Sequence, residues 1–137
     1  FSILLYNTDS CNYNKKKISE NDSQENQEVP KDKFFIISLE GKDISKEKLY
    51  IIFDTENNSA YGFSGCNTFT SKFITKNKGI AIENVITTKM YCEKNAMLEK
   101  EFIKTLTEST KKVIKQDSLF LKDQNNKILF SGVLFKE

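Results

Sequence analysis

The chain from Phe34 onward consists of short apolar runs separated by polar residues that favour turns. Runs of about four to eight apolar, β-branched or aromatic residues with such boundaries are typical of β-strands. Alternation is clearest between Phe69 and Lys76, where every second side chain falls on the same face of the strand. We expect strands over residues 34–39, 49–53, 60–64, 69–76, 80–85, 112–116, 119–122 and 128–135.

Turn-forming residues separate these runs. Gly41 follows the first run, and Asn57-Asn58, after the second, are suited to positive φ. Asn77-Lys78-Gly79 and residues 123–127 each predict a hairpin loop. Because so many consecutive strands are joined by short turns, the pattern favours antiparallel pairing in a strongly curled sheet or a small closed barrel.

One segment has a helical period instead. Leu98, Phe102 and Leu106 are spaced four residues apart with charged residues between them, which predicts an amphipathic helix over residues 95–109. We expect Asn95 to cap its N-terminus and its apolar stripe to cover one end of the sheet. The predicted fold class is mainly β (β-rich α+β), with about eight antiparallel strands in a curled sheet or small barrel and one amphipathic helix.

The first 33 residues have a different character. Residues 1–6 are apolar but too few to span a membrane. Cys11 follows the small residue Ser10, as does the lipid acceptor of bacterial lipoprotein signals, although the two residues before Ser10 depart from that signal. The alternative is a loose terminus or a first strand in which Cys11 is incidental. Residues 12–33 are charged and rich in amides, which predicts a flexible tether. The expected organisation is a signal-peptide remnant with a candidate lipidation site at 1–11, the tether at 12–33 and a folded domain at 34–137.

Composition narrows the chemistry that the chain can perform. All 21 basic residues are lysine, the formal net charge is +2, and histidine and tryptophan are absent. Without arginine there is no rigid guanidinium for bidentate contacts to phosphate or guanine, so we do not expect a nucleic-acid binder. Without histidine the usual general base is missing, and three scattered cysteines do not form a structural zinc site. We therefore expect no metal and no cofactor.

Several motifs occur together in a fixed order. They are "FFIISLEGKDI" at 34–44, "GFSGCNTF" at 62–69, "IAIENVITTKMYC" at 80–92, "MLEKEFIKTL" at 97–106 and "LFLKDQNNKILF" at 119–130. Together they resemble the META domain, which is found in the HslJ-type heat-inducible bacterial lipoproteins. The resemblance covers residues 34–135, with phenylalanine where the family usually has tryptophan near the start. It implies a β-rich, barrel-like fold and an envelope location, and it implies no catalytic residues.

Cys66 admits three interpretations. As a metal ligand it lacks partners, and as a nucleophile it lacks a histidine base. In an exported chain, with Cys11 set aside for lipid, Cys66 and Cys92 remain as a pair, and oxidising compartments preserve disulfides. In a cytosolic protein the two would instead be buried free thiols that pack as small apolar groups. For an exported protein we expect a structural disulfide between Cys66 and Cys92.

Polar residues near these cysteines form a second candidate site. Gly65 is expected to supply a positive φ or a close backbone approach where the strand bends, and Asn67 to bond the local backbone. A polar site would form if five residues converge at one end of the sheet. These are Ser64, Asn67, Thr87, Thr88 and Lys89.

These observations favour a non-enzymatic protein of the bacterial periplasm or outer membrane, with a structural, stress-related or partner-binding role. Its partner would be an envelope protein or a small ligand, and lipid on Cys11 would attach it to the membrane. One alternative is a small barrel that binds an apolar ligand. A further alternative is an enzyme that uses Cys66 together with Asp54 or Glu83.

Overall fold

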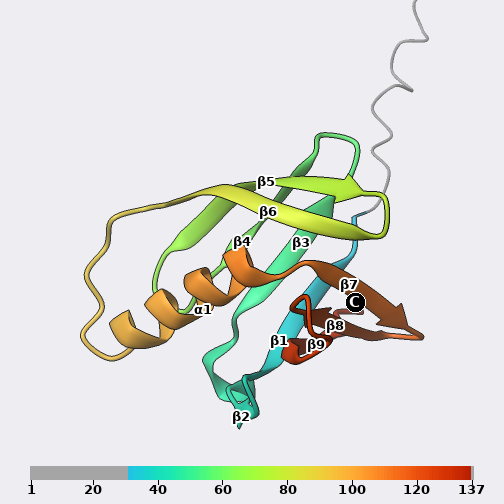
Figure 1. The fold of residues 1–137 in the computed structure, drawn as a ribbon. Coiled ribbons are helices and arrows are strands. Elements are labelled where there is room, and N and C mark those ends of the chain that lie inside the picture. The colour runs from blue at the N-terminus through green and yellow to red at the C-terminus, as the bar shows by residue number, and fades with distance from the viewer. Residues whose placement is uncertain (1–30, 137) are drawn as a thin grey trace, which may run out of the picture. The chain divides into compact units, whose positions relative to one another are not determined.

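The computed structural model describes residues 31–136. The predictions for Cys11 and for most of the tether lie outside these residues. Within them the chain forms one antiparallel sheet, a 3-10 helix and an α-helix (Figure 1). The elements are β1 (Lys33–Leu39), β2 (Lys42–Asp43), η3 (Ser45–Glu47), β3 (Tyr50–Asp54), β4 (Ser59–Phe63), β5 (Thr68–Lys76), β6 (Gly79–Thr87), α1 (Ala96–Glu108), β7 (Lys111–Lys115), β8 (Ser118–Lys122) and β9 (Ile128–Leu134).

The sheet is built mainly from hairpins between consecutive strands. Its order is β6-β5-β4-β3-β1-β9-β8-β7, and the short β2 pairs with the end of β1. The central strand is β1, because it pairs with β3 on one side and with the last strand, β9, on the other. The sheet therefore has two arms, β3 to β6 and β7 to β9, which meet at β1.

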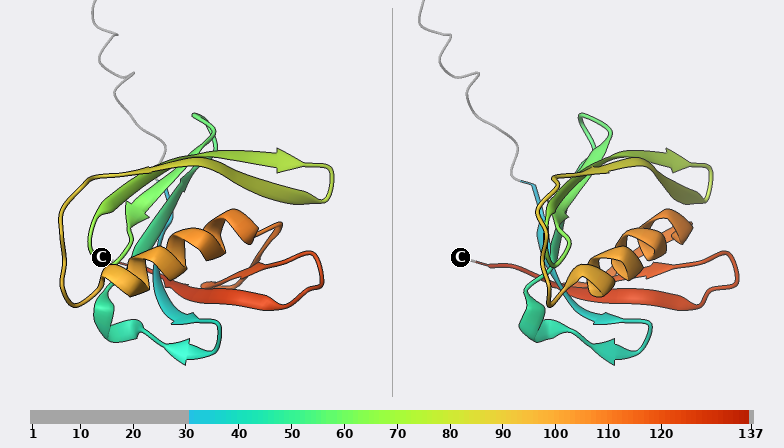
Figure 2. Two further views of the ribbon diagram at one scale, coloured as in Figure 1. Left: turned by 60° about the vertical axis from the view of Figure 1, so that its left-hand side comes forward. Right: turned by 90° about the vertical axis from the view of Figure 1, so that its left-hand side faces the viewer.

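The two arms curl toward each other until their edge strands, β6 and β7, approach (Figure 2). The Ile80 N–H donates a 2.8 Å hydrogen bond to the carbonyl oxygen of Thr110, just before β7. A Cβ at Gly79 would lie 2.5 Å from that same oxygen, so this approach requires a residue without a side chain. No strand ladder joins β6 to β7 in the described part of the chain, and the sheet is a half-barrel rather than a closed barrel.

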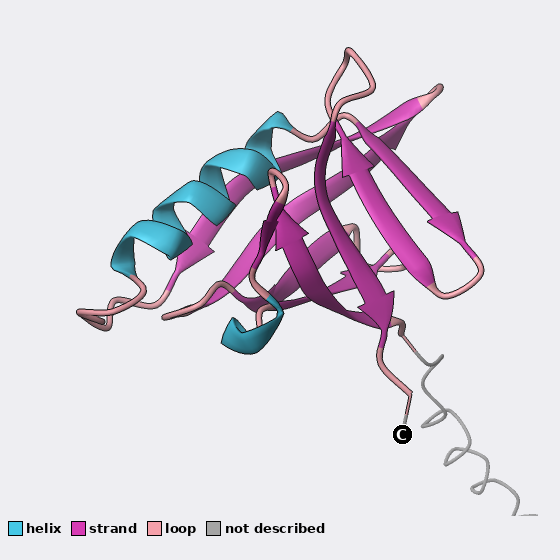
Figure 3. Ribbon diagram, turned by 90° about the horizontal axis from the view of Figure 1, so that it is seen from below, coloured by secondary structure: helices cyan, strands magenta, loops and turns pink. Residues whose placement is uncertain are grey.

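The helix α1 lies between the two arms, on the concave side of the sheet (Figures 2 and 3). Phe102 and Leu106 are fully buried, and Leu98 packs against the core. The Phe102 ring centroid is 5.8 Å from that of Phe69 on β5 and 5.3 Å from that of Phe130 on β9. Aromatic pairs at these distances attract beyond the burial of their area. The helix thus joins both arms through one apolar core.

The structure confirms the predicted fold class, and each predicted strand matches an observed one to within two residues at both ends. The sequence pattern missed β2 and η3, which are too short for a period to be visible. The helix lies within the curl rather than over one end of the sheet. Thr75, which alternation places on the same face of β5 as Phe69 and Phe73, is exposed because it lies near the hairpin. Among the described residues, no helix has the length and apolar character needed to cross a bilayer.

Candidate functional site

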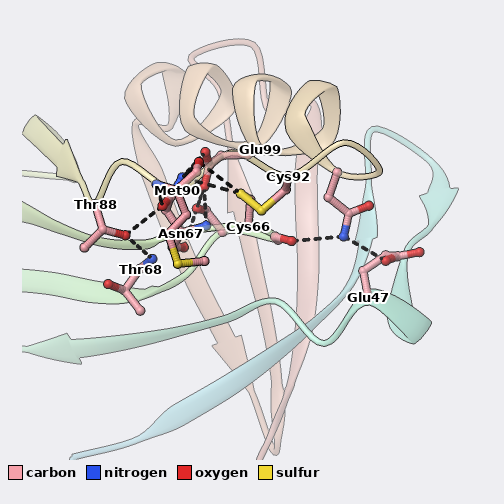
Figure 4. The surroundings of a disulfide bond; sticks show 11 residues. Glu47, Cys66, Asn67, Thr68, Thr88, Met90, Cys92 and Glu99 are labelled. Carbon is pink, nitrogen blue, oxygen red and sulfur yellow. Dashed lines mark hydrogen bonds between the residues drawn. A yellow bond between two sulfur atoms is a disulfide. The ribbon is translucent and has the colours of Figure 1, made fainter.

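A disulfide joins Cys66, in the turn between β4 and β5, to Cys92, in the connection from β6 to α1 (Figure 4). Their Cα atoms are 5.8 Å apart. Gly65 precedes the first cysteine with a φ of +106°, a backbone conformation that residues with a side chain rarely adopt. Glycine therefore allows the turn that places Cys66 opposite Cys92.

The side chain of Asn67 binds the same connection by hydrogen bonds. Its Oδ1 accepts from the backbone N–H of Met90 at 2.7 Å and from the Thr88 hydroxyl at 2.8 Å. Its Nδ2 donates to the Met90 carbonyl at 3.3 Å and to the Glu99 carboxylate at 2.9 Å. Asn67 is buried, so these bonds also satisfy its polar atoms. Its partners are thus largely in a distant segment, and the expectation of mainly local backbone bonds was wrong.

Glu99, in the first turn of α1, completes the network. Its carboxylate accepts hydrogen bonds from the Ser64 hydroxyl, from the Asn67 backbone N–H at 2.7 Å and from the Asn67 amide. Burial raises the pKa of Glu99, but the hydrogen bonds from Ser64 and Asn67 together bring it below its ordinary value of 4.5. The carboxylate is therefore ionised at neutral pH and holds the helix against the β4–β5 turn.

Asn95 occupies the N-cap position of α1, as predicted, but its side chain does not cap the helix. Its Nδ2 instead donates to the Gly65 carbonyl at 2.9 Å and to the Glu47 carboxylate at 3.1 Å (Figure 4). The expected capping bond was therefore wrong. Asn95 instead links the start of the helix to the β4–β5 turn and to η3.

The structure brings together part of the predicted polar site. Ser64, Asn67 and Thr88 belong to one hydrogen-bonded network. Thr87 pairs with Phe69 in the β5–β6 ladder. Lys89 is exposed, and no hydrogen bond or ion pair within residues 31–136 joins it to the network. The predicted convergence thus holds for three of the five residues.

The network also contains a residue that the sequence did not single out, Glu99. A carboxylate between apolar positions of an amphipathic helix is usually solvated, and only the packing of α1 turns this one toward Ser64 and Asn67. The acids considered for a cysteine enzyme lie elsewhere. Asp54 accepts hydrogen bonds from Asn57, and Glu83 lies opposite Lys72 in the register of β5 and β6.

The arrangement braces the chain rather than presenting reactive groups. Both sulfur atoms are used in the disulfide, and the Glu99 carboxylate and Asn67 amide already have protein partners. Within residues 31–136, no group of three or more Cys, Asp or Glu side chains is placed to hold a metal ion. The site fixes the path of residues 88–95, the connection between β6 and α1.

This braced segment and its flanks carry exposed apolar side chains. The exposed fractions are 69% for Ile86, 61% for Met90, 84% for Tyr91 and 76% for Met97. Large apolar groups on a connection whose backbone is fixed at several points are suited to contact with another molecule. We therefore regard this surface, together with the brace beneath it, as the candidate functional site.

The fold and the site define a class: a small antiparallel half-barrel with a helix in its concave side and a disulfide between two connections. The sequence profile of the META domain matches residues 27–132, and the chain belongs to this family. This confirms the resemblance seen in the sequence motifs. No curated protein matches the chain.

Three solved structures share the fold. A protein from Burkholderia xenovorans, determined by NMR, is 14% identical over 96% of this chain and 98% of its own, with a TM-score of 0.62. A second NMR structure is 22% identical over 74% and 88%, with a TM-score of 0.58. A DUF4847 family protein from Bacteroides vulgatus is 11% identical over 77% and 93%, with a TM-score of 0.56. At these identities the likeness shows the fold alone.

Proposed function

We propose that this META domain is a non-enzymatic binding domain of the bacterial cell envelope, in the periplasm or at the outer membrane. The observation that carries the proposal is the disulfide between Cys66 and Cys92. Disulfides form and persist in oxidising compartments such as the periplasm and are rare in the cytosol. The bond holds in place a connection that presents apolar side chains, which is suited to recognition.

The site supports binding better than catalysis. A cysteine enzyme needs a free thiolate and a base that activates it. Here the sulfur of Cys66 is bonded to that of Cys92, and the nearby carboxylate of Glu99 accepts hydrogen bonds from Ser64 and Asn67. We therefore assign these residues to the support of a surface.

The packing also favours a surface partner over an apolar ligand inside the sheet. The concave face is occupied by large side chains that are at most 2% exposed, among them Phe34, Phe69, Phe73, Phe102 and Phe130. A ligand there would have to displace part of a close-packed core, at a cost of several kcal/mol. We accordingly place the contact with the partner on the outside of the molecule.

Fractionation of the native bacterium, combined with thiol labelling, tests the proposal. We expect the protein in the envelope fraction, with Cys66 and Cys92 protected from alkylation until a reductant is added. A Cys11→Ser variant should move from the membrane pellet to the soluble periplasm if lipid on that residue attaches the protein. A cytosolic protein with two alkylatable thiols at 66 and 92 would refute the proposal.

The proposed role extends to envelope stress. A strain that lacks the gene should grow like its parent under ordinary conditions and more slowly after heat or detergent challenge. Complementation with the wild-type gene, but not with a Cys66→Ala/Cys92→Ala variant, should restore growth. Equal growth of the two strains under every challenge would contradict the stress role. It would not bear on the proposed envelope location.

A further inference from the structure

The connection from β6 to α1, residues 88–95, projects beyond the end of the sheet (Figures 1 and 2). We call it the projecting connection. Met90 and Tyr91 lie within it, and Met97 lies two residues beyond it in the first turn of α1; all three side chains are more than 60% exposed. Exposed apolar groups are common singly, but three within residues 90–97 are suited to contact with another molecule.

The projecting connection is held at both ends and in the middle. The disulfide fixes Cys92, and the side chain of Asn67 bonds both backbone groups of Met90. Asn95 is tied to the Gly65 carbonyl. Because the backbone is already fixed, little conformational entropy would be lost when the exposed side chains enter a binding partner.

Lysines surround these apolar groups. Lys89 and Lys94 belong to the projecting connection, and others lie on α1 and on β2. Lys89 and Lys100 have no ion-pair partner among the described residues. Three others are paired: Lys42 with Glu101, Lys94 with Glu47 and Lys104 with Glu108. The five lysines concerned are Lys42, Lys89, Lys94, Lys100 and Lys104.

The acidic groups of this surface are mostly occupied. The Glu99 carboxylate faces Ser64 and Asn67, and the Glu101 carboxylate lies 3.1 Å from the Lys42 ammonium. Glu93 is the acid of the projecting connection that stays exposed. Lys89 and Lys100 therefore remain unpaired beside the apolar side chains, with Glu93 as the exposed acid of the same connection.

A hollow of about 390 Å³ lies beside Met97. It combines the apolar side chains of Met97 and Leu98 with lysine ammonium groups, which suits a ligand that is anionic at one end and apolar at the other. Its lining residues are Lys42, Met97, Leu98, Lys100, Glu101 and Lys104.

We propose that the projecting connection and the first turns of α1 dock on the surface of an anionic phospholipid bilayer. Tyr91, Met90 and Met97 enter the head-group region, and the lysines contact lipid phosphates. Tyrosine suits this boundary because its ring is apolar and its hydroxyl stays hydrated, and lysines near an anionic leaflet add attraction. The proposal rests on the envelope location proposed above, and it concerns a contact separate from lipid on Cys11.

The geometry favours a bilayer over a protein partner. Protein interfaces have an apolar core within a broad patch that is depleted in lysine and glutamate. Here Met90 and Tyr91 belong to a narrow projecting connection that also carries Lys89 and Lys94. Separate side chains that protrude among cations fit the spaces between lipid head groups.

Vesicle co-sedimentation tests the proposal with the full chain carrying Cys11→Ser, so that no lipid contributes at that position. We expect binding to vesicles that contain 30% phosphatidylglycerol and at least tenfold weaker binding to pure phosphatidylcholine. Met90→Ser/Tyr91→Ser/Met97→Ser should lower binding to the anionic vesicles at least tenfold. Lys89→Gln and Lys100→Gln should each lower it about fivefold, the attraction expected of one unpaired lysine near an anionic surface.

The matched control replaces apolar side chains that are exposed elsewhere, Ile114→Ser/Ile128→Ser, and should bind like its parent. Thermal unfolding confirms that every variant is folded. Binding that is equal for both vesicle types, or unchanged by the triple variant, overturns the proposal. The proposal is also overturned if the parent protein self-associates, the triple variant does not, and neither binds vesicles. In that case the surface would bind a second copy of the chain. Protein that is envelope-located and disulfide-bonded but fails to bind vesicles refutes this inference alone.

Discussion

Asn67 and Glu99 illustrate how a few polar side chains position a segment that has little regular structure of its own. The amide of Asn67 both donates and accepts, so one side chain holds the two backbone groups of Met90. The same amide also donates a hydrogen bond to the carboxylate of Glu99. A buried polar network of this kind is stabilising only while each member keeps its partners.

Replacing Glu99 with glutamine should therefore lower the free energy of unfolding by about 2–3 kcal/mol at pH 7, because hydrogen bonds to a charged group are lost and one donor then faces another. The pKa of Glu99 is lowered in the folded state, so its contribution is fully present above the ordinary value of 4.5 and is lost as the pH falls through the lower folded value. Urea denaturation from pH 7 to pH 3 checks both statements.

The difference between wild type and Glu99→Gln should shrink below pH 4.5. Glu93→Gln, on the exposed part of the projecting connection, is the control and should change stability by less than about 0.5 kcal/mol. A difference that stays constant down to pH 3 would show that Glu99 acts through its shape and not through its charge.

At the scale of elements, the important feature is that the disulfide joins two connections and not two strands. One end lies between β4 and β5 and the other between β6 and α1, with a sequence separation of 26 residues. The strand ladders and the Phe102 contacts involve other residues, and we expect them to persist without it. Loss of the bond should therefore loosen the projecting connection more than the sheet.

The double variant Cys66→Ala/Cys92→Ala should lose about 3–4 kcal/mol of unfolding free energy in the chain-entropy account, yet retain its far-ultraviolet circular dichroism. Amide hydrogen exchange should rise mainly over residues 88–95. Reduced wild type is the matched comparison and should behave like the double variant. If exchange rises evenly across the sheet instead, the bond supports the whole fold and not this connection.

At the scale of the whole folded unit, residues 31–136, the sheet is a half-barrel whose two edges approach each other. Ile80 and Thr110 share the hydrogen bond there, and Gly79 leaves room for it. The arms are also joined by α1, whose Phe102 contacts both of them, and by Lys112 of β7, whose ammonium lies 4.5 Å from the ring centroid of Phe53 on β3. These contacts protect the strand edges without a complete barrel.

Gly79→Ala tests this closure. The added methyl group would meet the Thr110 carbonyl at 2.5 Å, so the edges must separate, and we expect a loss of about 1–3 kcal/mol in unfolding free energy. The Ile80 amide should exchange faster in the variant. Lys78→Ala, in the same hairpin, is the control and should be nearly neutral. An unchanged stability for Gly79→Ala would mean that the closing contact is unimportant.

Particular residues show how far the sequence predicts the site. Gly65 and the two cysteines could be identified because turn chemistry and compartment leave few roles for them. Ser64, Asn67 and Thr88 were placed near one another by their positions at strand ends. Glu99 was not found, since nothing in a helical pattern distinguishes an inward-facing acid from a solvated one. The exposure of Met90 and Met97 could not be predicted from the sequence and is known only from the fold.

The sequence by itself determined the strands, the helix and the hairpins, because alternation, helical spacing and turn residues act over a few neighbouring positions. The tertiary structure decided how far the sheet curls, that α1 enters the concave side, and that Asn67, Met90 and Glu99 meet. The network joins residues 23 to 35 positions apart, and the pairing of β1 with β9 joins residues that are still farther apart. No local pattern encodes such distances, so the surface that we propose as functional becomes visible only once the chain is folded.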